Sequence, residues 1–269
     1  MARCGMFVCT LRYRRVCLGV VALAGMWWTA PAAIAQSKPR SIAADEISAR
    51  EILQRADEVR FPKAGFEVSV NIRTAQDGRV TEDSSYRVLS KGNENTIVLT
   101  TEPASERGQI LLMKERDLWI FLPRVSQPVR LSLAQRSVGQ VSNGDIARAN
   151  FVGDYTPTLI GKETVGSDAL YVLDLAAVDR GVTYQRVKYW VQQGNYRPYK
   201  AEFYSLSGRL LKTCRYGEFR LLGGMIRPTK LVMVDALNKG EESTLEYSDM
   251  KLRELPDRIF TKDYLKRLE

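Results

Sequence analysis

Phe-Glu-Val-Ser-Val-Asn-Ile-Arg-Thr, at residues 66–74, alternates apolar and polar side chains without a break. Successive side chains of a β-strand point to opposite faces, so this period of two predicts a strand with one buried face. Asp77-Gly78 follows at once and is a preferred pair for a tight hairpin turn. The stretch therefore predicts an antiparallel sheet that begins near residue 66.

Further strands are expected on both sides of similar turn signals along the chain. Gly92-Asn93, Ser207-Gly208, Gly223-Gly224 and Asn238-Lys239-Gly240 separate apolar-rich runs. The expected strands are 86–89, 96–101, 109–114, 118–122, 170–176, 184–191, 199–206, 209–222, 229–236 and 243–252. Strands joined by tight turns are antiparallel. We therefore predict a mainly β fold of about ten or eleven strands, forming one curved sheet or open barrel.

One helix is expected just before this sheet. Ser48 and Glu51 form a capping box, and Ile47 and Ile52 are placed for a hydrophobic staple. Apolar residues recur at helical spacing up to Val59, before Pro62 ends the pattern. A helix with one apolar stripe must pack on another apolar surface.

The stretch 123–167 departs from the strand pattern and carries Pro128, Pro157 and several glycines. Short helices are expected near 131–135 and 145–152. A long irregular stretch inside a compact domain is uncommon and often forms a lid or binding loop. An insertion at the edge of the sheet, without a function, is the alternative.

The first 35 residues have the pattern of an export signal. Arg12, Arg14 and Arg15 precede an apolar run at 16–28, and Ala33-Ile34-Ala35 matches a cleavage site. We expect cleavage near Ala35, which leaves residues 36–269 as a single domain in the periplasm. No cysteine follows the apolar run closely, so lipidation is not expected.

The residue types present argue against most kinds of catalysis. The chain of 269 residues contains no histidine, which removes Ser-His and Cys-His dyads and histidine-bound zinc. After cleavage Cys214 is the single cysteine, so neither a disulfide nor a thiolate metal site is expected. Chemistry between two carboxylates remains open on sequence alone. We expect a protein that is not an enzyme and has no cofactor or resident metal.

The charge of the chain gives no sign of nucleic-acid binding. The net charge is +9 overall and falls to +5 once the four arginines of residues 1–35 are removed. The remaining basic residues are dispersed rather than gathered in a stripe. We therefore expect no nucleic-acid partner.

Several expected strands are apolar on both faces, most clearly at 110–113, 118–122 and 231–234. Such strands need a cover on both sides or a cavity that they line. The two readings, a lined ligand cavity and an ordinary core beneath helices, are equally compatible with the composition. On the first reading, the predicted hydrophobic lining comprises Leu112, Met113, Trp119, Phe121, Val232 and Val234. Arg130 and Asp145 are predicted to hold the central stretch closed, with a plain surface role as the alternative.

An ordered set of short motifs resembles the outer-membrane lipoprotein-sorting family, which is LolA-like. The set comprises DLWIFLP at 117–123, PVRLS at 128–132, NGD at 143–145, RPYKAEFY at 197–204, GRLLK at 208–212, IRP at 226–228 and FTKDYL at 260–265. The resemblance covers residues 52–268 and points to a broad, poorly characterised branch of the family.

This resemblance implies an incomplete β-barrel of the LolA/LolB kind, with an N-terminal helix and short helices covering its mouth. It implies a soluble periplasmic carrier, or chaperone, that takes acyl chains of a lipid or lipoprotein into a hydrophobic cavity. The implied delivery partners are an inner-membrane transporter and an outer-membrane acceptor. The alternative is a sensor or accessory protein that binds a protein partner, such as an RND-type transporter or an envelope-stress regulator.

Overall fold

The computed structural model describes residues 47–92, 94–125, 127–148 and 151–265. The predicted export signal and its cleavage site lie outside these ranges. The described chain is mainly β, and thirteen strands form one antiparallel sheet in the order β6-β5-β4-β3-β2-β1-β15-β14-β13-β12-β11-β10-β9. These strands are β1 (Phe66–Gln76), β2 (Arg79–Lys91), β3 (Asn95–Glu102), β4 (Ile110–Lys114), β5 (Asp117–Phe121), β6 (Val129–Leu131), β9 (Tyr155–Val165), β10 (Asp168–Ala177), β11 (Arg186–Gln192), β12 (Pro198–Tyr204), β13 (Leu210–Leu222), β14 (Met225–Asp235) and β15 (Glu241–Leu252).

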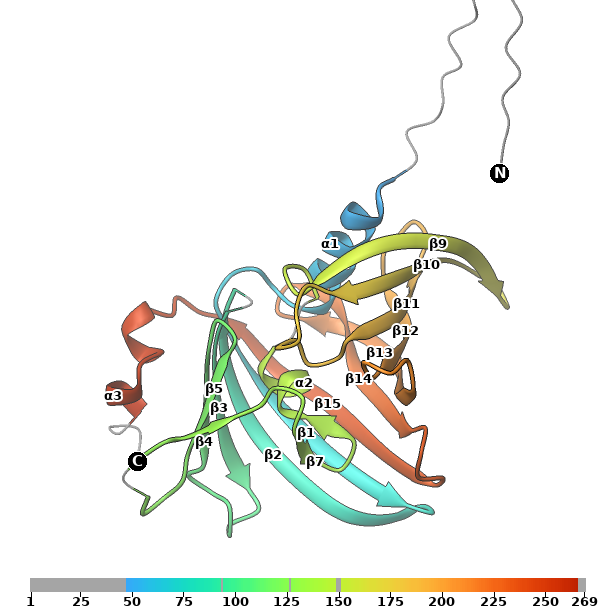
Figure 1. Ribbon diagram of the computed structural model, residues 1–269. Helices are drawn as coiled ribbons and strands as arrows, with labels where there is room; N and C mark the ends of the chain where they lie inside the picture. The colour runs from blue at the N-terminus through green and yellow to red at the C-terminus, as the bar shows by residue number, and fades with distance from the viewer. Residues whose placement is uncertain (1–46, 93, 126, 149–150, 266–269) are drawn as a thin grey trace, which may run out of the picture. The chain divides into compact units, whose positions relative to one another are not determined.

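The sheet consists of two runs of consecutive antiparallel strands, β1 to β6 and β9 to β15. The last strand, β15, pairs with the first, β1, and so joins the two runs. β15 pairs with β1 from Phe66↔Leu252 to Gln76↔Glu241, so the two ends of the chain meet in the middle of the sheet. β6 and β9 are the free edges, and the sheet does not close on itself. Figure 1 shows it bending around the elements that lie within the curve.

The elements within the curve are two helices and a small hairpin. They are α1 (Ala49–Arg60), β7 (Arg136–Val138) paired with β8 (Val141–Ser142), and α2 (Asn143–Ala147). The Ser48 side chain accepts a hydrogen bond from Glu51 N at 3.1 Å, which confirms the predicted helix start. Ile52, Leu53 and Ala56 bury the apolar stripe of α1 against the main core. None of the helices in the described part of the chain has the length and apolarity of a membrane-spanning segment.

A second, smaller core lies on the opposite, convex face of β3, β4 and β5. Ile97, Ile110 and Leu112 pack there against Leu255, Ile259, Phe260 and Leu265. These last residues belong to the C-terminal segment, which contains the short helices η1 (Asp257–Ile259) and α3 (Lys262–Leu265). The convex face of these strands is therefore covered by the end of the chain.

The sequence underestimated the number of strands. The expectation of ten or eleven is corrected to thirteen in the main sheet, with two more in the hairpin β7–β8. β9 was missed because Pro157 and Gly161 interrupt its pattern and its register shifts near Gly161. Residues 131–135 do not form the expected helix, and the second expected helix is shorter and earlier, at α2.

Candidate functional site in the concave interior

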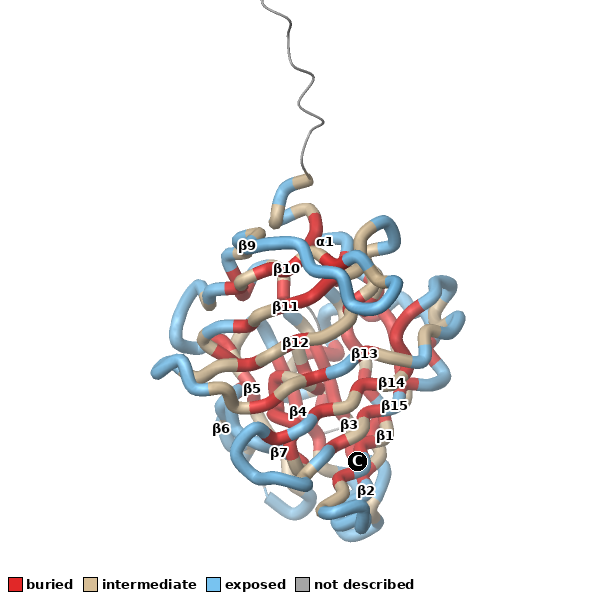
Figure 2. Tube along the Cα trace, turned by 90° about the vertical axis from the view of Figure 1, so that its right-hand side faces the viewer, coloured by how far each residue is buried: buried red, intermediate tan, exposed pale blue. Residues whose placement is uncertain are grey.

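The concave face of the sheet is covered by a segment that lies within the stretch 123–167, where the sequence departs from the strand pattern. We call residues 133–148 and 151–155 the plug. Seven plug side chains are buried in the main core, namely Leu133, Val138, Val141, Ile146, Ala147, Phe151 and Tyr155. In Figure 2 the exposed residues lie mainly along β9 and in the turns, whereas the other strands of the sheet are mostly buried or intermediate.

The plug leaves little free space in the interior. A void of about 20 Å³ lies between the plug and β13–β14, and another of about 10 Å³ lies between α2 and the start of β1. A larger pocket of about 260 Å³ lies beside the plug, against Tyr86, Leu111, Ile120 and Leu131. An acyl chain in the deep interior would therefore have to take the place of plug side chains.

A buried ion pair joins the plug to the floor of the sheet. Lys212 of β13 donates to Oδ2 of Asp145 at 2.6 Å, and the two side chains are only 4% and 8% exposed. The same carboxylate accepts the Tyr184 hydroxyl at 2.8 Å and the Ser142 N–H at 2.8 Å. Oδ2 of Asp145 thus accepts three hydrogen bonds, which offset the cost of burying its charge.

A second buried carboxylate joins the plug to α1. Oδ2 of Asp57 accepts the backbone N–H groups of Phe151 at 2.8 Å and Val152 at 2.7 Å. Its other oxygen lies 3.5 Å from Nη1 of Arg60, one helical turn on. Burial raises the pKa of Asp57 to about 6, despite the opposing effect of Arg60.

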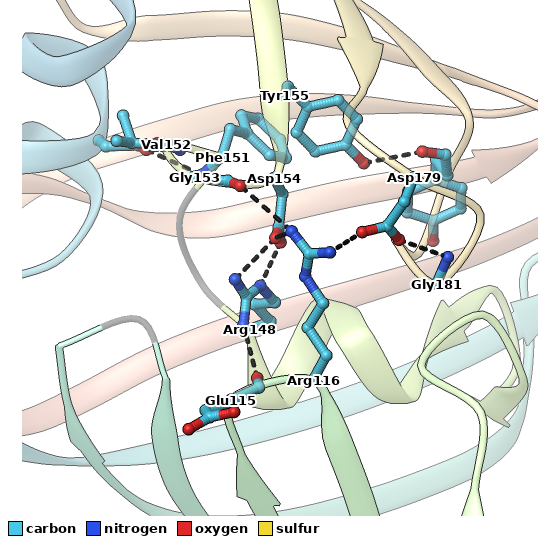
Figure 3. A network of polar contacts seen from close by, with 12 residues as sticks. Glu115, Arg116, Arg148, Phe151, Val152, Gly153, Asp154, Tyr155, Asp179 and Gly181 are labelled. Atoms are coloured by element: carbon cyan, nitrogen blue, oxygen red, sulfur yellow. Dashed lines mark hydrogen bonds and ion pairs between the residues drawn. The ribbon is translucent and has the colours of Figure 1, made fainter.

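A third set of charges ties the end of the plug to both halves of the sheet, as Figure 3 shows. Arg148 forms a two-pronged ion pair with the buried Asp154 and donates to the Glu115 carbonyl at 2.7 Å. Arg116, in the β4–β5 turn, contacts Asp154 at 3.5 Å and also pairs with Asp179, beyond β10. The plug is therefore held at its surface by a network that spans the concave side.

The structure separates the six residues predicted to line one cavity. Met113 points to the concave core and is fully buried. Leu112, Trp119 and Phe121 face the other side, where they pack against the C-terminal segment. Because neighbouring residues of a strand face opposite sides, a single lining made of all these residues is excluded.

The predicted residues of β14 also lie on the convex side. Leu231 and Met233 are buried in the concave core, whereas Val232 is half-buried and Val234 is 37% exposed. The apolar run 231–234 thus supplies both faces. The concave residues are the alternate pair, Leu231 and Met233.

The two predicted plug contacts differ in their surroundings. Asp145 lies in the buried network with Lys212, as described above. Arg130 is exposed on β6 and pairs with Asp117 of the neighbouring strand β5. Arg130 therefore connects two strands of the sheet, β5 and β6.

Sequence reasoning missed Asp57, Arg60 and Lys212, although their positions carried a signal. Asp57 and Arg60 follow Leu53 and Ala56 by four residues, which places both on the apolar stripe of α1. Lys212 alternates with Cys214 and Tyr216, two inward residues of β13. A charged residue at an inward position is the exception that predicts a buried polar site.

The site holds no arrangement typical of metal or thiol chemistry. Among the described residues, no group of three acidic or cysteine side chains could hold a metal ion. Cys214 is buried in the concave core, and burial raises the pKa of its thiol to about 12. Such a thiol is protonated at neutral pH and is a poor nucleophile.

Comparison with known proteins places this arrangement in a family. The fold is shared with a LolA superfamily protein from Nitrosomonas europaea, which is 62% identical; the match covers 81% of this chain and 100% of that chain, with a TM-score of 0.78. A family model described as an uncharacterized protein matches residues 92–267. The chain belongs to the LolA superfamily.

Two more distant structures share the fold. A DUF1329 family protein from Desulfovibrio piger is 22% identical, with a TM-score of 0.69 and coverage of 81% of this chain and 97% of that chain. A domain from Vibrio parahaemolyticus named for outer membrane lipoprotein sorting is 20% identical, with a TM-score of 0.70 and coverage of 81% and 98%. Among curated proteins, none matches the sequence.

Proposed function

We propose that this protein is a non-catalytic carrier of the bacterial periplasm that takes an acyl chain of a lipid or lipoprotein into its concave interior. The proposal rests on the way in which the concave face of the sheet is covered. The apolar concave face is closed by a segment of the chain rather than by a second sheet, and buried charges anchor that segment. Membership of the LolA superfamily supports this role.

On this proposal, the structure corresponds to the carrier with its concave interior covered by the plug. The sheet acts as an incomplete barrel, and α1 and the plug close its mouth. Phe151, Ile146 and Tyr155 hold the place that an acyl chain would take, and the 260 Å³ pocket beside the plug gives a point of entry. Burying a chain releases about 0.8 kcal/mol per methylene, which can offset displacement of the plug.

Polar anchors suit a cover that must open and close. Hydrogen bonds and ion pairs are lost when the groups part, but water replaces part of their energy once the groups are exposed. A plug held by apolar packing alone would expose its whole surface to water on opening. The anchors at Asp57, Asp145 and Asp154 therefore favour a reversible movement.

The cellular location follows from the sequence and the family together. The export signal predicted at residues 1–35 directs the chain to the periplasm, and the Vibrio parahaemolyticus domain is named for outer membrane lipoprotein sorting. An inner-membrane transporter and an outer-membrane acceptor are the delivery partners that fit such a carrier. A sensor that binds a protein partner is the alternative function.

Native mass spectrometry of the protein purified from a bacterial envelope tests the proposal. We expect a co-purifying lipid or lipoprotein at one copy per chain, which is identified after solvent extraction. Met233→Asp, on the concave face, abolishes its retention, whereas Val234→Asp, on the exposed face, does not; circular dichroism confirms that both variants fold. A mass without ligand that stays unchanged after incubation with envelope lipids contradicts the carrier and favours the sensor.

A further inference from the structure

Arg60 is a charged side chain buried in the aromatic part of the concave interior. It is 8% exposed, and its guanidinium carbon lies 4.4 Å from the ring centroid of Phe151. The corresponding distances are 5.7 Å to Tyr216 and 6.0 Å to Phe61. Aromatic faces attract a cation, but they provide no acceptor for its N–H groups.

The polar groups around Arg60 are incompletely paired. Within the described residues, Nε and Nη1 of Arg60, Oδ1 of Asp57 and the Tyr189 hydroxyl are buried and make no hydrogen bond. The ion pair between Nη1 and Oδ1 measures 3.5 Å, which exceeds the 2.7–2.9 Å usual for a charge-assisted hydrogen bond. An unpaired polar group costs free energy in an apolar interior, so its presence there points to a role.

Asp57 can pair with only part of the Arg60 guanidinium, because Oδ1 alone faces Nη1. Its Oδ2 is already committed to the backbone N–H groups of Phe151 and Val152 on the plug. Arginine offers five donors in a planar fork that matches a carboxylate or phosphate. Arg60 therefore retains donors for a second anion.

These donors meet the apolar floor of the interior. The void of about 20 Å³ is lined by Arg60 and also by Tyr216, Leu231 and Met233. Asp145 and Asp154 line it as well, and each is neutralised by an ion pair, with Lys212 and Arg148 respectively. Tyr189 packs at 5.2 Å from Phe151 and 6.1 Å from Tyr216, between ring centroids, so its ring belongs to the same aromatic cluster. A charged group at one end of an apolar floor is the arrangement that an amphiphile requires.

We propose that Arg60 and Tyr189 form a subsite for the anionic headgroup of a single-chain amphiphile, whose alkyl chain lies along Leu231 and Met233. The inference rests on the carrier function proposed above and narrows its ligand class to a carboxylate or phosphate attached to a chain. Phe151 lies over Arg60, so the plug leaves its closed position when the headgroup binds. The Asp57 anchors to Phe151 and Val152 are then the contacts that open.

Calorimetric titration of the purified protein with laurate and with 1-dodecanol tests this subsite. The two ligands share an alkyl chain and differ in charge. We expect laurate to bind at least about tenfold more tightly, as a hydrogen bond to a charged group implies. Acetate carries the same charge without the alkyl chain. If the ligand is an amphiphile and not a free anion, acetate shows no measurable binding. Saturable acetate binding at Arg60 overturns the amphiphile assignment.

Tyr189→Phe is the decisive variant because it removes only a hydroxyl that has no partner. Stability is expected to stay the same or increase, while laurate affinity falls about fivefold and dodecanol affinity is unchanged. Tyr155→Phe is the matched control, since its hydroxyl donates to the Tyr184 carbonyl at 3.1 Å and is structural. It should leave the ratio of the two affinities unchanged.

The double variant Asp57→Asn/Arg60→Gln removes both charges together and should equalise the two affinities, with dodecanol binding as the sign of a folded protein. Equal binding of laurate and dodecanol to the unaltered protein overturns the headgroup subsite but leaves the carrier function intact. If neither laurate nor dodecanol binds, the carrier function itself is overturned. A laurate preference that survives in the double variant shows that another basic group, and not Arg60, binds the headgroup.

Discussion

Lys212 on β13 and Asp145 on α2 lie 67 residues apart in the sequence and 2.6 Å apart in the fold. Lys212 Nζ also donates to the Gln140 carbonyl, so one side chain of the sheet contacts both the hairpin β7–β8 and the following helix. The plug is thereby fixed to the floor of the sheet at a point where neither charge reaches water.

The Lys212–Asp145 pair is expected to contribute strongly to stability. Lys212→Met leaves Asp145 buried without its counter-charge and should lower the free energy of unfolding by about 3–5 kcal/mol. Denaturation in urea measures the loss. Lys230→Met is the matched control on β14, where the half-exposed Lys230 lies 3.5 Å from Glu218 and its loss should change stability by less than about 1 kcal/mol. Similar losses in the two variants would contradict the role assigned to the buried pair.

Asp57 predicts a particular pH dependence of stability. Burial raises its pKa from 3.8 to about 6, so the folded state binds this proton more tightly than the unfolded state. Its contribution to the free energy of unfolding therefore increases as the pH falls from about 6 to about 4, by up to about 3 kcal/mol. The lowered pKa values of Asp235 and Glu202 act in the opposite sense at more acidic pH.

The variant Asp57→Asn isolates this contribution. The difference in unfolding free energy between the unaltered protein and Asp57→Asn should increase as the pH falls through this window, in favour of the unaltered protein. Glu58→Gln, one residue on at the surface of α1, is the matched control variant. A difference that does not vary with pH for Asp57→Asn means that this carboxyl titrates normally in the fold.

The Arg116 contacts predict a salt-sensitive opening of the plug. Arg116 and Asp179 are partly exposed, so salt screens their attraction. The plug should then move away from the concave core more often. Opening can be followed at Cys214 by maleimide labelling, with peptide mass spectrometry to separate this thiol from those of residues 1–35. Arg116→Ala should accelerate labelling, as should high salt, while the free energy of unfolding changes by less than about 1 kcal/mol.

Arg107→Ala is the matched control for this measurement. Arg107 also forms an exposed ion pair, with Glu102, but lies away from the plug contacts. Labelling of Cys214 should proceed at the original rate. Equal acceleration in the two variants would show that the thiol reports general loosening and not movement of the plug.

The C-terminal segment is expected to act on stability rather than on ligand binding. Phe260 is 1% exposed in the convex core, and Phe260→Ala should lower the free energy of unfolding by about 3–5 kcal/mol. Arg258→Ala, in the same segment and exposed, should be close to neutral. Nζ of Lys262, in the same segment as Phe260, lies 4.1 Å from the ring centroid of Trp119. The fluorescence of Trp119 should therefore change in Phe260→Ala. Loss of lipid binding without loss of stability would contradict this assignment.

The strand pattern of the sheet could be predicted wherever one face is wet. Phe66 to Ile72 alternate cleanly because their neighbours Glu67, Ser69 and Asn71 meet solvent on the other face. The alternation is lost at 110–113, because a second cover lies over the convex side. That cover comes from residues 255–265, far along the chain, and local periodicity carries no information about it.

Because local periodicity does not show which segment covers each face, the predicted lining combined residues from both faces. Apolar residues on both faces left two covers and a lined cavity equally open, and the structure shows two covers at 110–113. Which residues of a strand face the interior depends on which cover lies on the concave side. Met113 and Leu112 are equally apolar, and only the path of the plug and of the C-terminal segment separates them. Inward charges such as Lys212 were the better indication of the concave face, since they interrupt an otherwise apolar set.

Photo-crosslinking with a fatty acid that carries a diazirine at its chain end tests the central claim most directly, because adjacent residues of β14 report on opposite faces. We expect the label, displaced by excess unlabelled fatty acid, to attach to Met233 and to the plug residue Phe151, and to spare Val232 and Val234. A label on Trp119, Phe121 or Val234 with Met233 and Phe151 unmodified would contradict the proposed carrier function, since the chain would then bind outside the concave interior.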